Sequence, residues 1–384
     1  MSRRLAVLLG TLCLSILGWF WMQDFSLTGL MRQPQACNPN RPDGVEDLLR
    51  LANKYGFPGA QVSLRGKDGN WSDCTVGWAD WAGLGEPMSV QHRMRYLSLS
   101  KVLTSALSVK LVQEGRLNLD ELLVDALHVN GPYADPRVAL ITFRQLLSHT
   151  AGFDRRLSGD PMMVNVPWCP KMVETLSDFR LDFAPGERFA YSNLGYCLMG
   201  AALERMNGQA LAALITGELL QPTGLMRIRP VKNGVQEIDE PRLQVHPEER
   251  FDVLNELDYD SMHATGAWSG TAADFGRLME SIFISSPPYS LLDLEGRRSL
   301  TEVAEDCEIA KWRHCHGLGL YRYREKGGPT IYWRDGSLHG GTGFFAVAED
   351  GQIVVWVANS RQPNWMQIND SIGRAIYSYI KNRP

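Results

Sequence analysis

The pattern of apolar and polar residues predicts helices and strands in separate parts of the chain. Apolar residues recur at helical spacing over residues 45–55, 98–114 and 364–381. Shorter apolar runs bounded by turn residues predict strands over residues 59–65, 71–78, 343–348 and 353–358. The segment Lys67-Asp68-Gly69-Asn70 joins the first two strands and Asp350-Gly351 joins the last two. Both pairs are therefore expected to form hairpins.

The order of these elements predicts an α+β fold. Strands lie near both ends of the chain, and the stretch between them, as far as about Met262, is expected to hold mostly helices and loops. Strands from the two ends would form one sheet, with the helical region inserted between them. A cleft is expected where the sheet meets this region, and active sites often lie at such positions.

One segment departs from this pattern because it is apolar on all sides. Residues 5–22 carry no charge, follow Arg3 and Arg4, and end with the aromatic run Trp19-Phe20-Trp21. The length suits either a signal-peptide core or a short transmembrane helix. Bulky aromatic residues fit a membrane interface better than a signal peptidase site, so residues 1–24 are expected to be an uncleaved anchor, with a cleaved signal as the alternative.

The basic residues ahead of this segment place the rest of the chain outside the cytoplasm. We expect a single-pass protein of the inner membrane with its main domain in the periplasm, or a periplasmic or secreted protein if the segment is removed. Residues 25–41 are polar and proline-bearing and are expected to be a linker to a domain over residues 42–384. Within the 384 residues the formal net charge is -4 and no basic tract occurs, so a nucleic-acid partner is not expected.

Cysteine usage agrees with an exported domain. Cys13 lies in the apolar segment, and an even number of cysteines remains: Cys37, Cys74, Cys169, Cys197, Cys307 and Cys315. Such a set permits disulfides, although the pairing does not follow from the sequence beyond a possible small loop between the last two. His314 and His316 flank Cys315, but no second ligand cluster at a standard spacing accompanies them, so no metal site is predicted.

Candidate chemistry begins with Ser98-Leu99-Ser100-Lys101, which has the spacing S-x-x-K at the start of a predicted helix. A serine and a lysine three residues apart share one helical face, so the amine can approach the hydroxyl. A serine hydroxyl becomes a good nucleophile when a neighbouring base takes its proton. Ser378-Tyr379-Ile380-Lys381 has the same spacing, so the pattern alone does not identify the site.

A second motif supplies the missing context. Tyr191-Ser192-Asn193 is the only Y-x-N in the chain, and it follows a turn at residues 185–188. A tyrosine beside a protonated lysine has a lowered phenol pKa and can act as a general base. The asparagine amide can both donate and accept, which suits it to orient a lysine and a substrate amide.

The third element should be a strand whose backbone donates an N–H group to the developing oxyanion. A lysine or histidine followed two residues later by glycine is the expected start of this strand, and candidates include Lys67-Asp68-Gly69, Lys232-Asn233-Gly234, Lys326-Gly327-Gly328 and His339-Gly340-Gly341. Lys326-Gly327-Gly328 precedes Pro329, which has no N–H group, whereas His339-Gly340-Gly341 precedes Thr342 and the last hairpin. His339, Gly341 and Thr342 are therefore the predicted residues of this element.

Taken in order, the three motifs resemble those of the serine β-lactamase and penicillin-binding protein superfamily. The resemblance is closest to its class C-like branch, which includes D-alanyl-D-alanine carboxypeptidases, D-aminopeptidases and esterases. Further segments carry it: LLSHTAGF at residues 146–153, PGERFAYSNLGY at 185–196 and GTAADF at 270–275. It covers about residues 42 to 381.

This resemblance implies an antiparallel sheet flanked by helices, with an inserted and mostly helical subdomain, and no cofactor. Ser98 would form the acyl-enzyme, and Lys101 and Tyr191 would share its proton. Asn193 would hold the substrate.

The resemblance also implies roles for the third motif. The N–H groups of Ser98 and Thr342 would form the oxyanion hole, with Gly341 before it and His339 lining the opposite wall. Many β-lactamases have lysine where this chain has His339, and a largely neutral histidine suits a substrate carboxylate less well. His149, within the matching LLSHTAGF segment, is expected to be structural.

These features predict a serine hydrolase acting on a peptide, with D-amino acid peptides of peptidoglycan the most accessible in the periplasm. A small-ester esterase or a weak β-lactamase is an alternative within enzymes. A periplasmic ligand-binding protein that kept the fold without turnover is an alternative of another class, because a fold does not guarantee a reaction.

We predict that the full-length chain stays in the membrane fraction through carbonate washing, because the aromatic end of residues 5–22 suits a membrane interface. Fractionation followed by N-terminal sequencing tests this expectation. Recovery of a soluble form that starts between residues 24 and 37 would instead identify a cleaved signal.

Overall fold

The computed structural model describes residues 33–80, 85–246, 249 and 251–383. The predicted anchor over residues 1–24 lies outside this part of the chain. None of the helices in the described part is long and apolar enough to cross a membrane.

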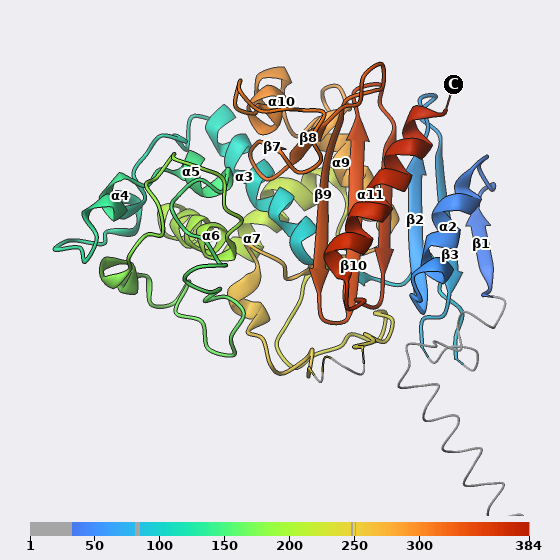
Figure 1. Cartoon of the computed structure of the whole chain (residues 1–384), viewed down its shortest axis with the longest axis horizontal. Coiled ribbons are helices and arrows are strands. Elements are labelled where there is room, and N and C mark those ends of the chain that lie inside the picture. The colour runs from blue at the N-terminus through green and yellow to red at the C-terminus, as the bar shows by residue number, and fades with distance from the viewer. Residues whose placement is uncertain (1–32, 81–84, 247–248, 250, 384) are drawn as a thin grey trace, which may run out of the picture.

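An antiparallel sheet of eight strands forms one half of the molecule (Figure 1). Its order is β1-β3-β2-β11-β10-β9-β8-β7, so strands from the two ends of the sequence meet where β2 pairs with β11. The strands are β1 (Gln35–Asn38), β2 (Gly59–Arg65), β3 (Trp71–Gly77), β7 (Cys315–His316), β8 (Tyr321–Tyr323), β9 (Ile331–Leu338), β10 (Gly341–Ala348) and β11 (Ile353–Ala358). The four predicted strands are confirmed, with the strand expected at residue 343 starting two residues earlier.

One face of this sheet is covered by the first and last helices. Helices α2 (Val45–Lys54) and α11 (Trp365–Lys381) lie side by side across it, although they stand at opposite ends of the domain's sequence (Figure 1). They bury a core rich in aromatic rings, in which Trp333 stacks on Phe344 and Trp356 contacts Phe57 edge-on. The helical spacing of apolar residues predicted both helices.

Helices α3 (Lys101–Gln113) and α9 (Ala272–Phe283) lie on the other side of the sheet. Nearly every residue of α3 is buried, since the helix runs between the sheet and the helical region. The helical region contains α4 (Leu123–Leu127), α5 (Phe143–Leu147), α6 (Asn193–Asn207), α7 (Leu211–Ile215) and α8 (Gln221–Thr223), and α10 (Leu294–Thr301) packs on α3.

Short elements complete the molecule. A small sheet of β4 (Met94–Arg95), β5 (Arg229–Pro230) and β6 (Trp268–Gly270) lies beside the start of α3. Single turns of tighter or wider helix are η2 (Leu97–Ser100), η3 (Pro136–Leu140), η4 (Val173–Asp178), η5 (Thr216–Leu220) and η6 (Tyr259–Met262).

The predicted α+β fold with an inserted helical subdomain is confirmed. The linker expected over residues 25–41 needs a correction, because Gln35–Asn38 forms the edge strand β1. This strand pairs with β3, and a disulfide joins Cys37 to Cys74 across the pair. Proline and polar residues had indicated a linker, but an edge strand tolerates both since one of its sides is unpaired.

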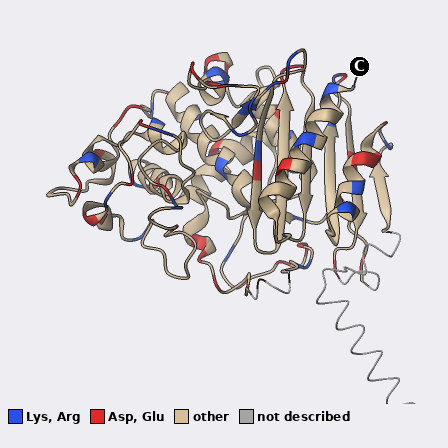
Figure 2. Cartoon of the chain, viewed as in Figure 1, with Lys and Arg blue, Asp and Glu red and all other residues tan. Residues whose placement is uncertain are grey.

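Every cysteine of the described chain is in a disulfide. The other two bonds join Cys169 to Cys197 and Cys307 to Cys315, the latter pair closing the small loop that the sequence suggested. The sulfur of Cys315 is therefore not available to a metal. Acidic and basic residues are interspersed over both the sheet and the helical region (Figure 2).

Candidate active site

Ser98 lies in the turn η2 that leads into α3, at the seam between the sheet and the helical region. Leu97 before it has a φ of 54°, a left-handed conformation that is uncommon for residues other than glycine. Leu97 and Leu99 are both buried, whereas Ser98 is half-exposed. Tyr96 anchors the turn because its N–H group donates to Trp268 O at 2.8 Å. The seryl hydroxyl is thus presented to the cleft from a well-packed turn.

The amine of Lys101 is buried directly behind Ser98. Its Nζ donates to Asn193 Oδ1 at 2.7 Å and to Thr265 O at 2.8 Å, and it lies 3.5 Å from Ser98 Oγ. Burial lowers the lysine pKa to about 8, an effect that the facing Tyr191 partly opposes. An amine with this pKa exchanges protons near neutral pH, unlike an exposed lysine.

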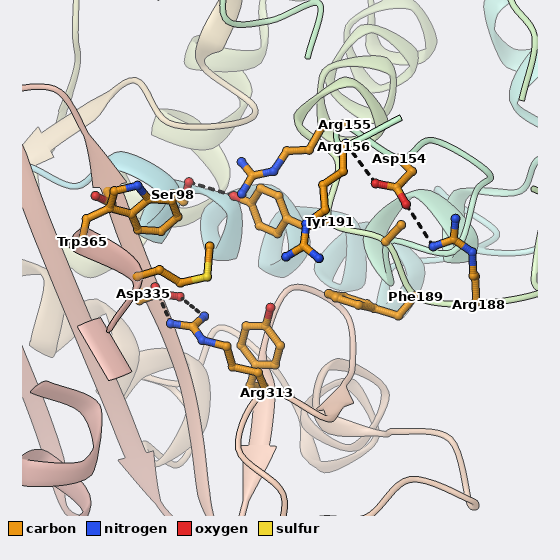
Figure 3. A pocket seen from close by; sticks show the side chains of 14 residues that line it. Ser98, Asp154, Arg155, Arg156, Arg188, Phe189, Tyr191, Arg313, Asp335 and Trp365 are labelled. Atoms are coloured by element: carbon orange, nitrogen blue, oxygen red, sulfur yellow. Dashed lines mark hydrogen bonds and ion pairs between the residues drawn. The ribbon is translucent and has the colours of Figure 1, made fainter. Parts of the chain in front are cut away.

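Tyr191 completes the contact with the nucleophile. Its hydroxyl is hydrogen-bonded to Ser98 Oγ at 2.8 Å (Figure 3). Burial raises the pKa of this phenol, but the cations of Lys101, Arg334 and Arg155 outweigh burial and lower the pKa to about 7. The guanidinium of Arg155 lies 4.5 Å from the ring centroid. A tyrosine with this pKa is partly ionised at neutral pH and can accept a proton.

Asn193 is held in one orientation by partners on both sides of its amide. It begins helix α6, which Ser192 caps by accepting the Gly195 N–H at 3.0 Å. The Asn193 oxygen accepts from Lys101, and its Nδ2 donates to Asp160 Oδ2 at 2.7 Å. Asp160 therefore fixes which end of the amide faces the lysine, and no sequence motif pointed to this residue.

His149 packs against the segment that holds Tyr191 and Ser192. The ring is buried beside Tyr191, and its Nδ1 accepts the Ser192 N–H at 3.2 Å. Burial holds the pKa of His149 well below its usual range, so the ring stays neutral. These contacts agree with the structural role expected from the sequence.

The strand beside Ser98 is β9, and not the strand that begins at Gly341. A Cβ on Gly336 of β9 would lie 2.9 Å from Ser98 N and 3.0 Å from Tyr96 O, so the two backbones approach as closely as glycine allows. Ser98 and Ser337 line the same cleft. The prediction that His339, Gly341 and Thr342 form this wall is therefore wrong.

The alternation of hydrogen bonds along the hairpin leads to the same correction. Strands β9 and β10 are joined by the two-residue turn His339-Gly340, with Leu338 opposite Gly341. Residues flanking such a turn exchange both backbone hydrogen bonds, and the next pair exchanges none. That next pair is Ser337 and Thr342, so the Ser337 N–H faces away from β10 and toward Ser98, whereas the Thr342 N–H faces β11.

The three residues of the incorrect assignment have other surroundings. His339 stacks on Phe251 at 3.9 Å, and its Nδ1 lies 2.8 Å from Glu249 Oε2. Gly341 lies against the Leu97 side chain. Thr342 is buried within the sheet.

The segment Arg334-Asp335-Gly336-Ser337 was not among the candidates from the sequence, because those all begin with lysine or histidine. Arg334 is 1% exposed, and its Nε donates to Ser98 O at 2.7 Å. Its guanidinium lies 5.5 Å from the Tyr191 ring centroid. Admitting arginine as the cation before x-Gly would have identified this segment.

Two hollows flank Ser98. The larger, of about 280 Å³, is lined by residues that include Tyr191, Ser337 and several arginines. The smaller, of about 90 Å³, is lined by residues that include Asn193, Thr265 and Leu338. A substrate can thus extend on both sides of a bond placed at the serine. Together, the fold and the site define a hydrolase of the β-lactamase type.

The chain belongs to the Beta-lactamase family, whose model matches residues 31–377. It is 32% identical to a putative fimbrial assembly protein FimD of Dichelobacter nodosus, over 80% of this chain and 75% of the relative. It is 25% identical to the D-alanyl-D-alanine-carboxypeptidase/endopeptidase AmpH of Escherichia coli K12, over 76% and 77% of the two chains. Esterase EstB of Burkholderia gladioli is 30% identical over 37% of this chain and 39% of its own.

Solved structures share the fold. The D-amino acid amidase of Ochrobactrum anthropi SV3 superposes with a TM-score of 0.71 at 19% identity, covering 88% of this chain and 100% of its own. A β-lactamase/D-alanine carboxypeptidase of Yersinia pestis gives a TM-score of 0.69 at 19% identity with the same coverage. The predicted fold class and superfamily are confirmed.

A pair of glycine variants tests which strand forms the wall of the site. In Gly336→Ala the new methyl group meets backbone atoms of Ser98 and Tyr96, so we expect turnover to fall by about 10²- to 10³-fold, the usual cost of a lost oxyanion donor. In Gly341→Ala the methyl group meets the Leu97 side chain at 3.1 Å, which can move, so the loss should be smaller. Ester hydrolysis and thermal melting of both proteins check this, and a larger loss in folded Gly341→Ala would reverse the assignment.

A charge variant tests the state of Tyr191. Arg155→Gln removes one of the cations that lower the phenol pKa, so that pKa should rise. The basic form of Tyr191 would then be lost at a higher pH, and the acidic limb of kcat/KM for a neutral nitrophenyl ester should move upward. Tyr191→Phe should abolish that limb together with most activity. An acidic limb that stays in place in Arg155→Gln would assign it to another group.

Proposed function

We propose that this protein is a serine acyl-hydrolase that forms an acyl-enzyme on Ser98. The observation that carries the proposal is the 2.8 Å hydrogen bond between Ser98 Oγ and a tyrosine hydroxyl whose pKa is about 7. An activated nucleophile of this kind needs a base within hydrogen-bond reach and a third group that orients the base. Tyr191 supplies the base, and Lys101 supplies the charge beside it.

In the proposed acylation, ionised Tyr191 takes the proton of Ser98 as Oγ attacks the substrate carbonyl. The N–H groups of Ser98 and Ser337 stabilise the oxyanion, and Ser337 here replaces Thr342 of the sequence-based hypothesis. The proton then passes from the Tyr191–Lys101 pair to the leaving amine or alkoxide as the scissile bond breaks. Deacylation repeats these steps with water as the nucleophile and Ser98 as the leaving group.

The proposed substrate is a peptide containing a D-amino acid, or an ester. Support for the peptide comes from the carboxypeptidase relative AmpH and from the D-amino acid amidase fold. Support for the ester comes from the partial match to esterase EstB. Asn193 lies beside the smaller hollow and could hold a substrate amide there, which favours the peptide.

We also propose that the domain works in an oxidising compartment, either anchored to the inner membrane or free in the periplasm. The three disulfides support an exported domain, because such bonds are rare in reducing cytoplasm. Peptidoglycan peptides would be accessible to it there.

Two serine variants test the proposal against a ligand-binding protein without turnover. Ser98→Ala should abolish both covalent labelling by fluorescent penicillin and hydrolysis of a short-chain nitrophenyl ester. Ser378→Ala is the matched control, because Ser378 has the same spacing to a lysine but is exposed on α11, where Lys381 pairs with Glu325 at 2.7 Å. Labelling and hydrolysis should persist in this control. Folded wild-type protein that neither labels nor hydrolyses would support the ligand-binding alternative.

A further inference from the structure

The larger hollow beside Ser98 is lined by more basic than acidic side chains. Its lining includes four arginines and two aspartates, a formal excess of two positive charges: Arg155, Arg156, Arg188, Arg313, Asp154 and Asp335. The chain as a whole has a net charge of -4, so this local excess runs against the bulk composition. A concentration of guanidinium groups in a cleft attracts anions.

Two of the four arginines are neutralised within the protein. Arg188 pairs with Asp154 at 3.0 Å. Arg313 binds Asp335 through two nitrogens at 2.9 and 2.8 Å, and it also contacts Asp370. These pairs use both aspartates of the cleft, so they leave the remaining two guanidinium groups as the source of the excess charge.

Arg155 and Arg156 form no ion pair with any residue in the described part of the chain. Arg155 is stacked over the Tyr191 ring and affects the base directly. Arg156 is exposed, and its side chain extends beside Tyr191 toward the middle of the cleft (Figure 3). Asp154 fixes the backbone here because its Oδ1 accepts the Arg156 N–H at 3.0 Å.

We propose that this cleft is a subsite for a carboxylate on the substrate, bound mainly by Arg156 with support from Arg155. The planar guanidinium matches a carboxylate through two parallel hydrogen bonds. Phe189, Tyr321 and Trp365 add apolar surface around the charged groups, which suits a short acidic side chain or acyl chain. This inference rests on the proposed hydrolase function and narrows its substrate class to acidic peptides or esters.

Two matched esters test the subsite. The 4-nitrophenyl esters of succinate and of monomethyl succinate have the same acyl chain with and without a negative charge. Wild-type protein should prefer the charged ester in kcat/KM by roughly tenfold, the worth of one charge-assisted hydrogen bond at a partly exposed site. Arg156→Gln should bring the ratio close to one, and Arg156→Lys should give an intermediate ratio.

Arg205→Gln is the control, since it removes the same charge from an exposed position near the end of α6, away from the cleft. The ratio should be unchanged in this variant. A wild-type ratio near one, or a ratio that is the same in Arg156→Gln and wild type, would overturn the subsite while leaving the hydrolase intact.

A binding measurement separates the subsite from the reaction. In Ser98→Ala protein, calorimetry should show tighter binding of N-acetyl-D-glutamate than of N-acetyl-D-glutamine, and adding Arg156→Gln should remove the difference. If this difference is present but wild-type protein hydrolyses neither ester, the subsite stands and the proposed function fails. Equal binding of the two ligands together with equal hydrolysis of the two esters overturns the subsite alone.

Discussion

The buried amine of Lys101 is the constraint on which the rest of the site depends. Removing an ammonium group from water is costly unless acceptors replace the solvent. Here the acceptors come from different parts of the chain: Asn193 begins α6 in the helical region, and Thr265 lies in the segment before β6. The amine therefore ties helix α3 to both of these segments, and the seam between sheet and helical region is held at the nucleophile.

The same buried lysine is one of three cations that lie around Tyr191. Lys101, Arg334 from β9 and Arg155 from the loop after α5 surround one phenol, and they outweigh the effect of its burial on the pKa. Arg334 also binds the Ser98 carbonyl oxygen, so one side chain both positions the nucleophile turn and adjusts the base. Arg156 adds further positive charge to the same cleft. The arginines beside Ser98 are thus proposed both to lower the pKa of the base and to bind a substrate carboxylate.

Much of this arrangement could be predicted from the sequence. Ser98, Lys101, Tyr191 and Asn193 were identified from spacing and context, and the structure brings all four together. Helical and strand periodicity likewise predicted α2, α11 and the two hairpins. These features depend on residues close in sequence, where local geometry determines which side chains share a face.

The wall opposite the nucleophile was decided only by the tertiary structure. Which strand lies beside Ser98 depends on the order of the sheet, and which N–H faces the serine depends on the register of β9 against β10. A shift of one residue reverses the direction of every backbone donor, and neither strand order nor register is encoded in a short motif. For the same reason Asp160 and Arg156 had no sequence signal, because each acts at a site that only the folded chain assembles. Arg334 had one in its spacing to Gly336, but choosing that segment over the other candidates required the order of the strands.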